Sequence, residues 1–105
     1  MPGSVKLIYI TTPDAETAEV LGRSLLEKHL AACINILPQM NSLYWWQEKI
    51  ESSREAVLIA KTDSTRVSAL IHEVESQHPY DVPCALTLNV ESGSEAYLNW
   101  LRTTR

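Results

Sequence analysis

Two consecutive strand-like segments, residues 33–46 and 49–62, constrain the fold more than any other feature of the sequence. A strand of about 13 residues spans roughly 40 Å, because each residue advances the chain by about 3.3 Å. A folded domain of about 100 residues has a radius of gyration of only about 13 Å. We therefore expect a long hairpin that projects beyond its own core. Its far end carries Tyr44, Trp45 and Trp46, and exposed aromatic surface of this kind is typical of a partner interface.

The composition is that of one folded domain. The chain has 105 residues, and single domains most often hold about 100 to 150 residues, so we expect a single domain over residues 1–105. Hydrophobic residues make up 45% of the chain and charged residues 21%, which favours a packed core over intrinsic disorder. Phe is absent, so three Trp and four Tyr supply all the aromatic bulk.

Charge and hydropathy argue against several classes of partner. The net charge is −4 and the nine basic residues are scattered, which is not the pattern of a nucleic-acid-binding surface. No apolar run reaches the roughly 20 residues that a membrane helix needs. The N-terminal residues lack the features of a signal peptide, and the two cysteines, Cys33 and Cys84, do not resemble a disulfide framework. The sequence thus predicts a cytoplasmic protein with reduced thiols.

The first part of the chain predicts a strand and then a helix. Residues 5–12 are too apolar for a half-exposed strand, so we expect this strand at the centre of the sheet with both faces buried. Pro13 suits the first position of a helix that is capped by Thr12 and runs to about residue 29. The apolar stripe predicted for this helix consists of Ala18, Leu21, Leu25 and Leu26.

The long hairpin and the second helix follow. Pro38 cannot donate to a strand ladder, which predicts a bulge or an edge at that point. The turn is expected at Gln47-Glu48, although neither Gly nor Asn is present there. Asp63 or Ser64 is expected to cap the second helix. The clearest amphipathic pattern of the chain lies in this helix, at Val67, Leu70, Ile71 and Val74.

The C-terminal third predicts a stiff connection, a strand and a short helix. Residues 78–83 contain two prolines and end the second helix, and residues 84–90 alternate as a strand does. The run from Ser92 to Glu95 has the form of a capping box, and it opens a helix that is expected to bury Tyr97, Trp100 and Leu101. The order is that of an α+β, ferredoxin-like βαββαβ sandwich with an additional C-terminal helix.

A set of short motifs along nearly the whole chain resembles one family, CutA, the divalent-cation tolerance proteins. The motifs are specific as an ordered set. They are Thr11-Thr12-Pro13-Asp14, Leu30-Ala31-Ala32-Cys33-Ile34-Asn35, Ser42-x-Tyr44-x-Trp46, Lys49-Ile50, Glu55, Lys61-Thr62, His78-Pro79-Tyr80 with Pro83, and Tyr97-Leu98-x-Trp100.

The resemblance implies a homotrimer whose long hairpins cross into neighbouring subunits, similar in architecture to the nitrogen-regulatory signalling proteins. It implies a role in the response and tolerance to copper and other divalent metal ions, with no defined catalytic activity. Animal members are linked to the anchoring of acetylcholinesterase, so a protein partner is a further expectation. Three positions depart from the family pattern: Thr12, Glu48 and Cys84 stand where members carry Cys, Gly and an acidic residue. Two of these departures change the possible metal ligands.

Three residues are candidate ligands for copper or another divalent metal ion. Cys33 and Cys84 offer thiolates and His78 offers an imidazole, which are donors that copper and zinc accept. Two of them also have a structural interpretation. Cys33 could be a small core residue, and His78 could cap the end of the second helix. A thiol enzyme that pairs Cys33 or Cys84 with His78 is a further alternative, but the sequence offers no third catalytic group and no oxyanion-hole loop. We therefore expect no enzymatic activity.

The remaining candidates concern the interface. Tyr44, Trp45 and Trp46 are expected to fill pockets of the neighbouring subunit, since Trp and Tyr are favoured interface anchors. Glu55, Lys61 and Tyr80 are polar residues in apolar or rigid surroundings, and with Trp46 they are expected to line the cleft between subunits. The same cleft could bind a small molecule or a nucleotide. That hypothesis, and a trimer that only scaffolds another protein, are the alternatives to metal binding.

Overall fold

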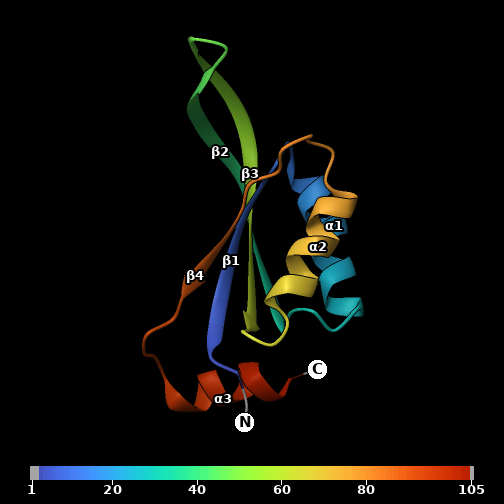
Figure 1. The fold of residues 1–105 in the computed structure, drawn as a ribbon, viewed down its shortest axis with the longest axis vertical. Helices are drawn as coiled ribbons and strands as arrows, with labels where there is room; N and C mark the ends of the chain where they lie inside the picture. The colour runs from blue at the N-terminus through green and yellow to red at the C-terminus, as the bar shows by residue number, and fades with distance from the viewer. Residues whose placement is uncertain (1–2, 105) are drawn as a thin grey trace.

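The computed structural model describes residues 3–104 as a four-stranded sheet with helices on one face and at one end (Figure 1). The strands lie in the order β2-β3-β1-β4, and all three pairings are antiparallel. This confirms the predicted α+β, ferredoxin-like arrangement. The elements are β1 (Val5–Thr12), α1 (Ala15–Glu27), β2 (Cys33–Trp46), β3 (Lys49–Asp63), α2 (Val67–Gln77), β4 (Ala85–Asn89) and α3 (Glu95–Thr103).

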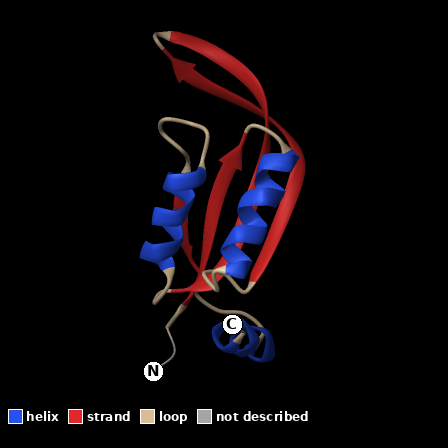
Figure 2. Cartoon of the chain, turned by 90° about the vertical axis from the view of Figure 1, so that its right-hand side faces the viewer, coloured by secondary structure: helices blue, strands red, loops and turns tan. Residues whose placement is uncertain are grey.

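Helices α1 and α2 cover one face of the sheet, and the core lies beneath them (Figure 2). Because side chains alternate along a strand, Ile8 and Ile10 of β1 point to this face, and both are fully buried. The core consists of Ile8, Ile10, Ala18, Leu21, Leu25, Ala31, Ala56, Leu58, Ala60, Leu70 and Val74. The predicted stripes of both helices therefore supply core residues, but Leu26 is 39% exposed.

The opposite face of the sheet is covered only at one end. There α3 packs Leu98 and Leu101 against Val5 in a second, smaller apolar cluster. Further along, Leu86 and Leu88 of β4 pair with Tyr9 and Leu7 of β1, so they share the face away from α1 and α2. Leu86 and Leu88 are exposed. We call this the open face. On it Val5 and Thr11 of β1 are buried but Leu7 and Tyr9 are only half-buried, so the prediction that β1 is buried on both faces is correct only in part.

The hairpin of β2 and β3 extends well past the two helices (Figures 1 and 2). It makes the chain elongated, with principal extents of 46 × 26 × 22 Å. At its end Leu43 is 76% exposed and Trp45 is 73% exposed. The predicted projecting hairpin with apolar side chains at its tip is confirmed by this geometry.

Two irregularities of the hairpin also match expectation. The β2–β3 register shifts by one residue between Leu37 and Met40, which is the bulge predicted at Pro38. The strands then pair up to Trp46 and Lys49, so Gln47 and Glu48 form a two-residue turn. Their φ angles are 48° and 67°, the left-handed conformation that a tight hairpin turn needs and that Gly and Asn adopt most easily.

The predicted helix caps are wrong in detail. Helix α1 begins at Ala15, and Asp14 is its N-cap: the carboxylate accepts a hydrogen bond from the Thr17 backbone N–H at 2.7 Å. Thr12 instead donates its hydroxyl to the Asp14 carbonyl oxygen at 2.8 Å. The side chain of Asp63 does not cap α2 because β3 runs through Asp63, and Arg66 becomes the N-cap.

The C-terminal helix differs from expectation in what it buries. The predicted capping box of Ser92 and Glu95 does not form, because the N-cap is Ser94, which makes no side-chain hydrogen bond there. Leu98 and Leu101 face the sheet, whereas Tyr97 is 41% and Trp100 is 44% exposed. The two rings stack on each other, with centroids 5.6 Å apart. Tyr97 and Trp100 therefore lie on a face of α3 next to the buried face that carries Leu98 and Leu101.

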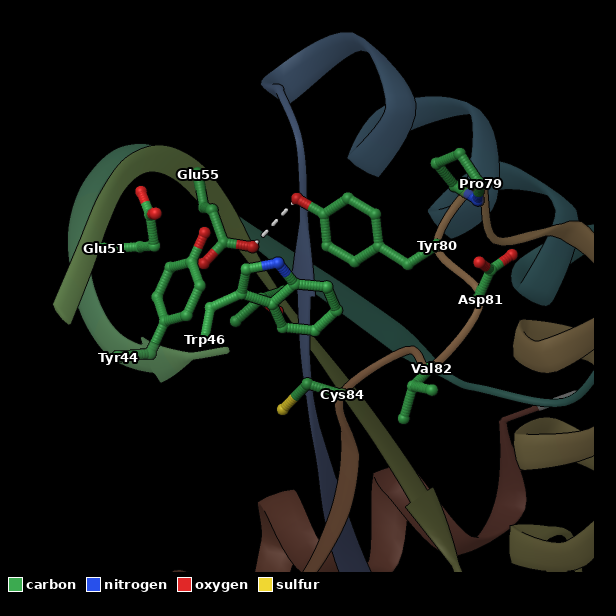
Figure 3. Close-up of a pocket in the computed structure, with 10 residues that line it drawn as sticks. Tyr44, Trp46, Glu51, Glu55, Pro79, Tyr80, Asp81, Val82 and Cys84 are labelled. Atoms are coloured by element: carbon green, nitrogen blue, oxygen red, sulfur yellow. Dashed lines mark hydrogen bonds between the residues drawn. The ribbon is translucent and has the colours of Figure 1, made fainter. Parts of the chain in front are cut away.

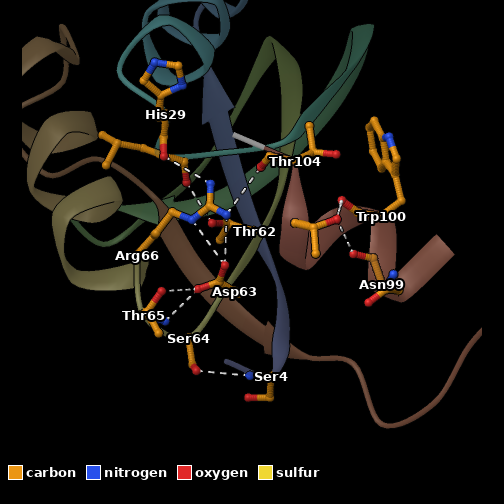
Figure 4. A network of polar contacts seen from close by, with 12 residues as sticks. Ser4, His29, Thr62, Asp63, Ser64, Thr65, Arg66, Asn99, Trp100 and Thr104 are labelled. Carbon is orange, nitrogen blue, oxygen red and sulfur yellow. Dashed lines mark hydrogen bonds and ion pairs between the residues drawn. The ribbon is translucent and has the colours of Figure 1, made fainter. Parts of the chain in front are cut away.

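A buried ion pair fixes the lower end of the sheet to the helices (Figure 4). The Arg66 guanidinium lies 3.0 Å from the Asp63 carboxylate and also donates to the carbonyl oxygens of His29 and Thr104. Burial opposes ionisation of Asp63, but hydrogen bonds from Thr65 and the charge of Arg66 outweigh it, so the pKa of Asp63 is lowered. We call these residues the Asp63–Arg66 cluster. It joins the end of β3, the loop after α1 and the end of α3.

None of the helices between residues 3 and 104 is both long enough and apolar enough to cross a membrane.

Candidate functional site

A pocket of about 770 Å³ lies on the open face, between the projecting hairpin and the loop that follows α2 (Figure 3). Clefts of roughly 300–1,000 Å³ are typical of small-molecule sites. The pocket is lined by Thr11, Tyr44, Trp46, Glu51, Glu55, Pro79, Tyr80, Asp81, Val82 and Cys84.

The register of the hairpin determines which side chains reach the pocket. Tyr44 of β2 pairs with Glu51 of β3, and cross-strand partners point to the same face. Trp46 lies two residues beyond Tyr44, and Glu55 lies four residues beyond Glu51, so all four share this face. Figure 3 shows them on one side of the pocket, facing the loop that carries Tyr80.

His78 holds the opposite wall in place. Its ring is buried, with Nε2 2.6 Å from the Thr11 carbonyl oxygen and Nδ1 accepting a hydrogen bond from the Tyr80 backbone N–H at 3.1 Å. The accepting Nδ1 requires that the proton of the neutral ring sits on Nε2, where it is donated to Thr11. A metal ion at His78 would therefore have to displace one of these two bonds. The backbone of His78, and not its ring, caps α2.

Tyr80 connects the two walls. Its hydroxyl lies 3.0 Å from a carboxylate oxygen of Glu55 (Figure 3). Burial raises the pKa of Tyr80 to about 12, and the hydrogen bond to the negatively charged Glu55 adds to this rise. Tyr80 thus remains neutral at physiological pH and donates its hydroxyl proton to Glu55.

The charge of the pocket has one sign. Three carboxylates line it, from Glu51, Glu55 and Asp81, and none of the lining residues is Lys, Arg or His. Lys49 shares the face of Trp46 through the strand register, but it lies at the hairpin tip and does not line the pocket. A concave surface with unpaired negative charge concentrates cations and repels anions.

Lys61 lies apart from the other residues predicted for the cleft. It is six residues from Glu55 on β3, which corresponds to about 20 Å along the strand. There the Lys61 ammonium donates to the Tyr97 hydroxyl at 3.1 Å and lies 5.2 Å from the centre of that ring. This hydrogen bond raises the pKa of Lys61. The structure thus brings together Glu55, Tyr80 and Trp46, but not Lys61.

The three predicted metal ligands are also separated within one chain. Cys33 pairs with Lys61 beside the apolar cluster under α3, whereas Cys84 lines the pocket just before β4. The register places them roughly 13 Å apart along the strands and three strand spacings of about 4.8 Å apart across the sheet. Among residues 3–104, no three His, Cys, Asp or Glu side chains converge in a way that could hold a metal ion. The residues of a single chain therefore do not fit a copper site made of Cys33, His78 and Cys84.

Glu51 and Asp81 are pocket residues that the sequence analysis did not identify. Asp81 belongs to the rigid segment from His78 to Pro83, whose conformation the sequence does not define. Glu51 could have been found from the strand register, because a two-residue turn at Gln47-Glu48 pairs it with Tyr44. The aromatic residues were predicted only as interface residues, yet Tyr44 and Trp46 also form one wall of the pocket.

Comparisons with known proteins agree with one another. A family model described as CutA1 divalent ion tolerance protein matches residues 6–104. The human relative named Protein CutA is 43% identical over 102 residues, covering 97% of this chain and 57% of the relative, so the chain spans little more than half its length. The divalent-cation tolerance protein CutA of Archaeoglobus fulgidus is 42% identical over 97 residues, covering 92% of this chain and 94% of the relative.

Solved structures show the same fold. The crystal structure of CutA from Xylella fastidiosa superposes with a TM-score of 0.92 at 40% sequence identity, covering 96% of this chain and 97% of that one. The divalent cation tolerance protein CutA1 from Thermus thermophilus also gives a TM-score of 0.92, at 36% identity, covering 95% of this chain and 97% of that one.

Proposed function

The chain belongs to the family of CutA1 divalent ion tolerance proteins, and we propose that it acts in tolerance to divalent metal ions. We further propose that it is a cytoplasmic, non-enzymatic homotrimer that binds copper or another such ion. The observation that carries this proposal is the family match over residues 6–104. The family is named for a tolerance and not for a reaction, and the proposal accordingly assigns no catalytic residue.

The homotrimer is proposed from the resemblance and from two exposed surfaces. The hairpin tip exposes Leu43, Trp45, Trp46 and Ile50, and the open face exposes Leu86 and Leu88. A contiguous apolar surface of this kind usually marks a contact with another chain. A hairpin that projects from one subunit onto the open face of the next would cover both surfaces at once.

Metal binding is proposed to need more than one subunit. Cys84 is the candidate thiol that lies in the pocket, beside three carboxylates, and a thiolate is a favourable ligand for copper. Since the described residues of one chain supply no complete ligand group, donors from a sister copy would have to complete it. Cys33 and His78 stay candidates for such an intersubunit set.

Titration with copper under reducing conditions, and with zinc as a redox-inactive ion, tests the metal proposal. Calorimetry should detect binding to the parent protein and a weaker affinity in Cys84→Ser. Parallel titrations of Cys33→Ser and His78→Ala determine whether those residues contribute. Equal affinity in the parent and all three variants would remove these residues as ligands, and absence of binding to the parent would reject direct metal binding.

Light scattering over a dilution series tests the trimer. The parent should have the mass of three chains, and Trp46→Ala should dissociate at higher concentration, because truncating a buried aromatic anchor typically costs about 2 kcal/mol or more. Val20→Ala is the matched control, since Val20 is exposed on α1, on the other side of the sheet from the pocket. A parent that is monomeric at all concentrations would contradict the proposal.

The pocket supports a second candidate function, the binding of a small molecule. Three of the four residues predicted for the cleft, Glu55, Tyr80 and Trp46, line one pocket of suitable size. A ligand bound only by the native state raises the apparent stability, so thermal-shift screening tests this candidate. A protein that only scaffolds a partner should show no shift with any small ligand.

A further inference from the structure

We propose that a patch of one subunit, formed by Lys61, Tyr97 and Trp100, docks into the pocket of a neighbouring copy of the same chain. We call these three residues the Lys61 patch. The contact rests on the proposed homotrimer and goes beyond it, because it names the two unlike surfaces that meet and the charges that pair across them. Its basis is that the chain carries two surfaces of opposite charge that cannot meet within it.

The Lys61 patch combines exposed rings with a positive charge. Tyr97 and Trp100 stack on each other and remain exposed. Large aromatic side chains that stay exposed are enriched where proteins contact one another. The Lys61 ammonium is held beside these rings by its bond to the Tyr97 hydroxyl, but it forms no ion pair with any of residues 3–104. Its charge is therefore available to a carboxylate from outside the chain.

The pocket offers the complementary surface. It also combines exposed rings, those of Tyr44 and Trp46, with charge, but its charge is negative and no basic residue lines it. The Glu55 carboxylate is bonded to Tyr80, whereas Glu51 and Asp81 have no ion-pair partner in the described part of the chain. Opposite potentials on two surfaces favour their contact and fix its register.

A single chain cannot bring the two surfaces together. Lys61 and Glu51 lie ten residues apart on β3, which corresponds to about 33 Å, and side-chain alternation places both on the open face. A hairpin that lies across the open face of the next subunit would bring the pocket of one copy to the Lys61 patch of the other.

The two surfaces also suit a closed ring. Because they differ, each subunit would use its pocket toward one neighbour and its Lys61 patch toward the other. A head-to-tail contact of this kind closes into a ring when the rotation between subunits allows it. Each chain has a net charge of −4, so copies repel one another in general. A lysine at the contact opposes this repulsion, and a ring leaves neither surface uncovered.

Exchange of the two charges tests the contact, with light scattering over a dilution series as the measurement. Lys61→Glu places like charges at the contact and should raise the concentration at which the trimer dissociates by about tenfold or more. Adding Glu51→Lys or Asp81→Lys to that variant restores opposite charges, and one of these double variants should regain most of the loss. The control Arg23→Glu makes the same change of charge on α1, which covers the other face of the sheet, and should assemble like the parent.

A second measurement needs no variant. A carbodiimide joins a lysine amine directly to a carboxylate that lies in contact with it, so treatment of the assembled parent should link Lys61 to Glu51 or Asp81. Mass spectrometry of the peptides identifies the link. Since Lys61 lies at the other end of the sheet from the pocket, such a link joins two chains.

The outcomes separate this contact from the homotrimer itself. A parent that is monomeric at every concentration rejects both. If the parent is a trimer but neither double variant regains assembly and no link forms, the contact is wrong and the trimer stands. If Arg23→Glu weakens assembly as much as Lys61→Glu does, the loss reflects net charge and also overturns the contact. If Lys61→Glu assembles like the parent, the patch is free for another partner and the contact is again wrong.

Discussion

The same β2–β3 ladder passes through two environments, and the two halves differ in what their side chains contact. From Ala56 to Asp63, β3 lies at the centre of the molecule, where most of its side chains are buried. From Lys49 to Arg54 the strand is largely exposed, although its pairing with β2 continues. Main-chain pairing alone makes a two-stranded hairpin only marginally stable in water. The inner half is thus stabilised by contacts with its own chain, whereas the projecting half lacks such contacts, as expected for a segment that the proposed trimer would cover.

The largest effect on stability is expected at the Asp63–Arg66 cluster. Arg66→Ala leaves the buried Asp63 carboxylate without its counter-charge and removes the bonds to the His29 and Thr104 carbonyl oxygens. Breaking a buried pair on one side typically costs about 3–5 kcal/mol of unfolding free energy. Urea denaturation at fixed protein concentration measures the loss. The control Arg54→Ala, an exposed arginine in the projecting half, should change stability by less than about 0.5 kcal/mol. Similar losses in both variants would contradict the proposed role of the cluster.

A pair of leucine substitutions compares the two halves directly. Leu58→Ala removes a fully buried side chain of the inner half and should cost about 2–5 kcal/mol. Leu43→Ala removes a side chain of the projecting half that is 76% exposed in the single chain, and without a partner it should cost less than about 0.5 kcal/mol. Denaturation is measured at protein concentrations above and below the one at which the chains assemble. The comparison distinguishes a hairpin tip that is exposed from one that another subunit buries. A cost for Leu43→Ala that grows with assembly would show that the tip is buried by another subunit, and equal cost at all concentrations would argue against it.

Lowering the pH is expected to have a third, smaller effect on stability through the Asp63–Arg66 cluster. The folded-state pKa of Asp63 lies below its ordinary value of 3.8, so the stability that its ionisation contributes is present above that value and is lost as the pH falls through the lower, folded pKa. The free energy of unfolding should therefore decline below about pH 5. In Asp63→Asn this decline should be shallower, although the variant is less stable at neutral pH. The same acid dependence in parent and variant would show that Asp63 does not contribute to it.

The smallest effect is expected at the hairpin turn. Gln47 and Glu48 both have positive φ, a conformation that costs most residues roughly 1–2 kcal/mol and that Asn and Gly adopt at lower cost. Replacing the pair by Asn-Gly should raise the free energy of unfolding by about 1 kcal/mol or less. Thermal denaturation measures the change, and Glu75→Gln, which removes one negative charge from an exposed position on α2, serves as the control. A decrease in stability would mean that the present side chains make contacts that offset their backbone strain.

Periodicity and turn chemistry predicted most of the fold. Pro38 predicted the bulge, Gln47-Glu48 the turn, and the spacing of Leu70 and Val74 the buried face of α2. These features arise from local backbone chemistry and from the alternation of apolar residues, which are visible in a sequence. The N-cap of α2 was not predicted correctly, because α2 begins only at Val67. The Asp63 carboxylate bonds within the turn before it, where it accepts from Thr65 and pairs with Arg66.

The pocket was predicted only in part, because it depends on which residues the folded chain brings together. Glu55, Tyr80 and Trp46 were identified as polar or aromatic residues in unusual surroundings, and they do meet. Lys61 was grouped with them for its polar character, but six residues along one strand separate it from Glu55 by about 20 Å, and within one chain it lies beside Tyr97. Tyr97 and Trp100 were predicted to be buried because α3 appeared to have one apolar face, whereas its buried residues are Leu98 and Leu101.

The bulge at Pro38 decides which aromatic residues belong to the pocket. It places one extra residue in β2, so even-numbered side chains after it occupy the face that odd-numbered ones hold before it. If β2 at its present length paired with β3 without the bulge, every side chain of β2 from Met40 onward would lie on the reverse side of the hairpin. Leu43 and Trp45 would then look toward Tyr80, and Tyr44 and Trp46 would look away. The extra residue therefore decides which face each aromatic side chain of this arm occupies. Deleting Gln39 would remove the bulge but keep Met40 opposite Glu55, so Tyr44 and Trp46 would still form the pocket wall.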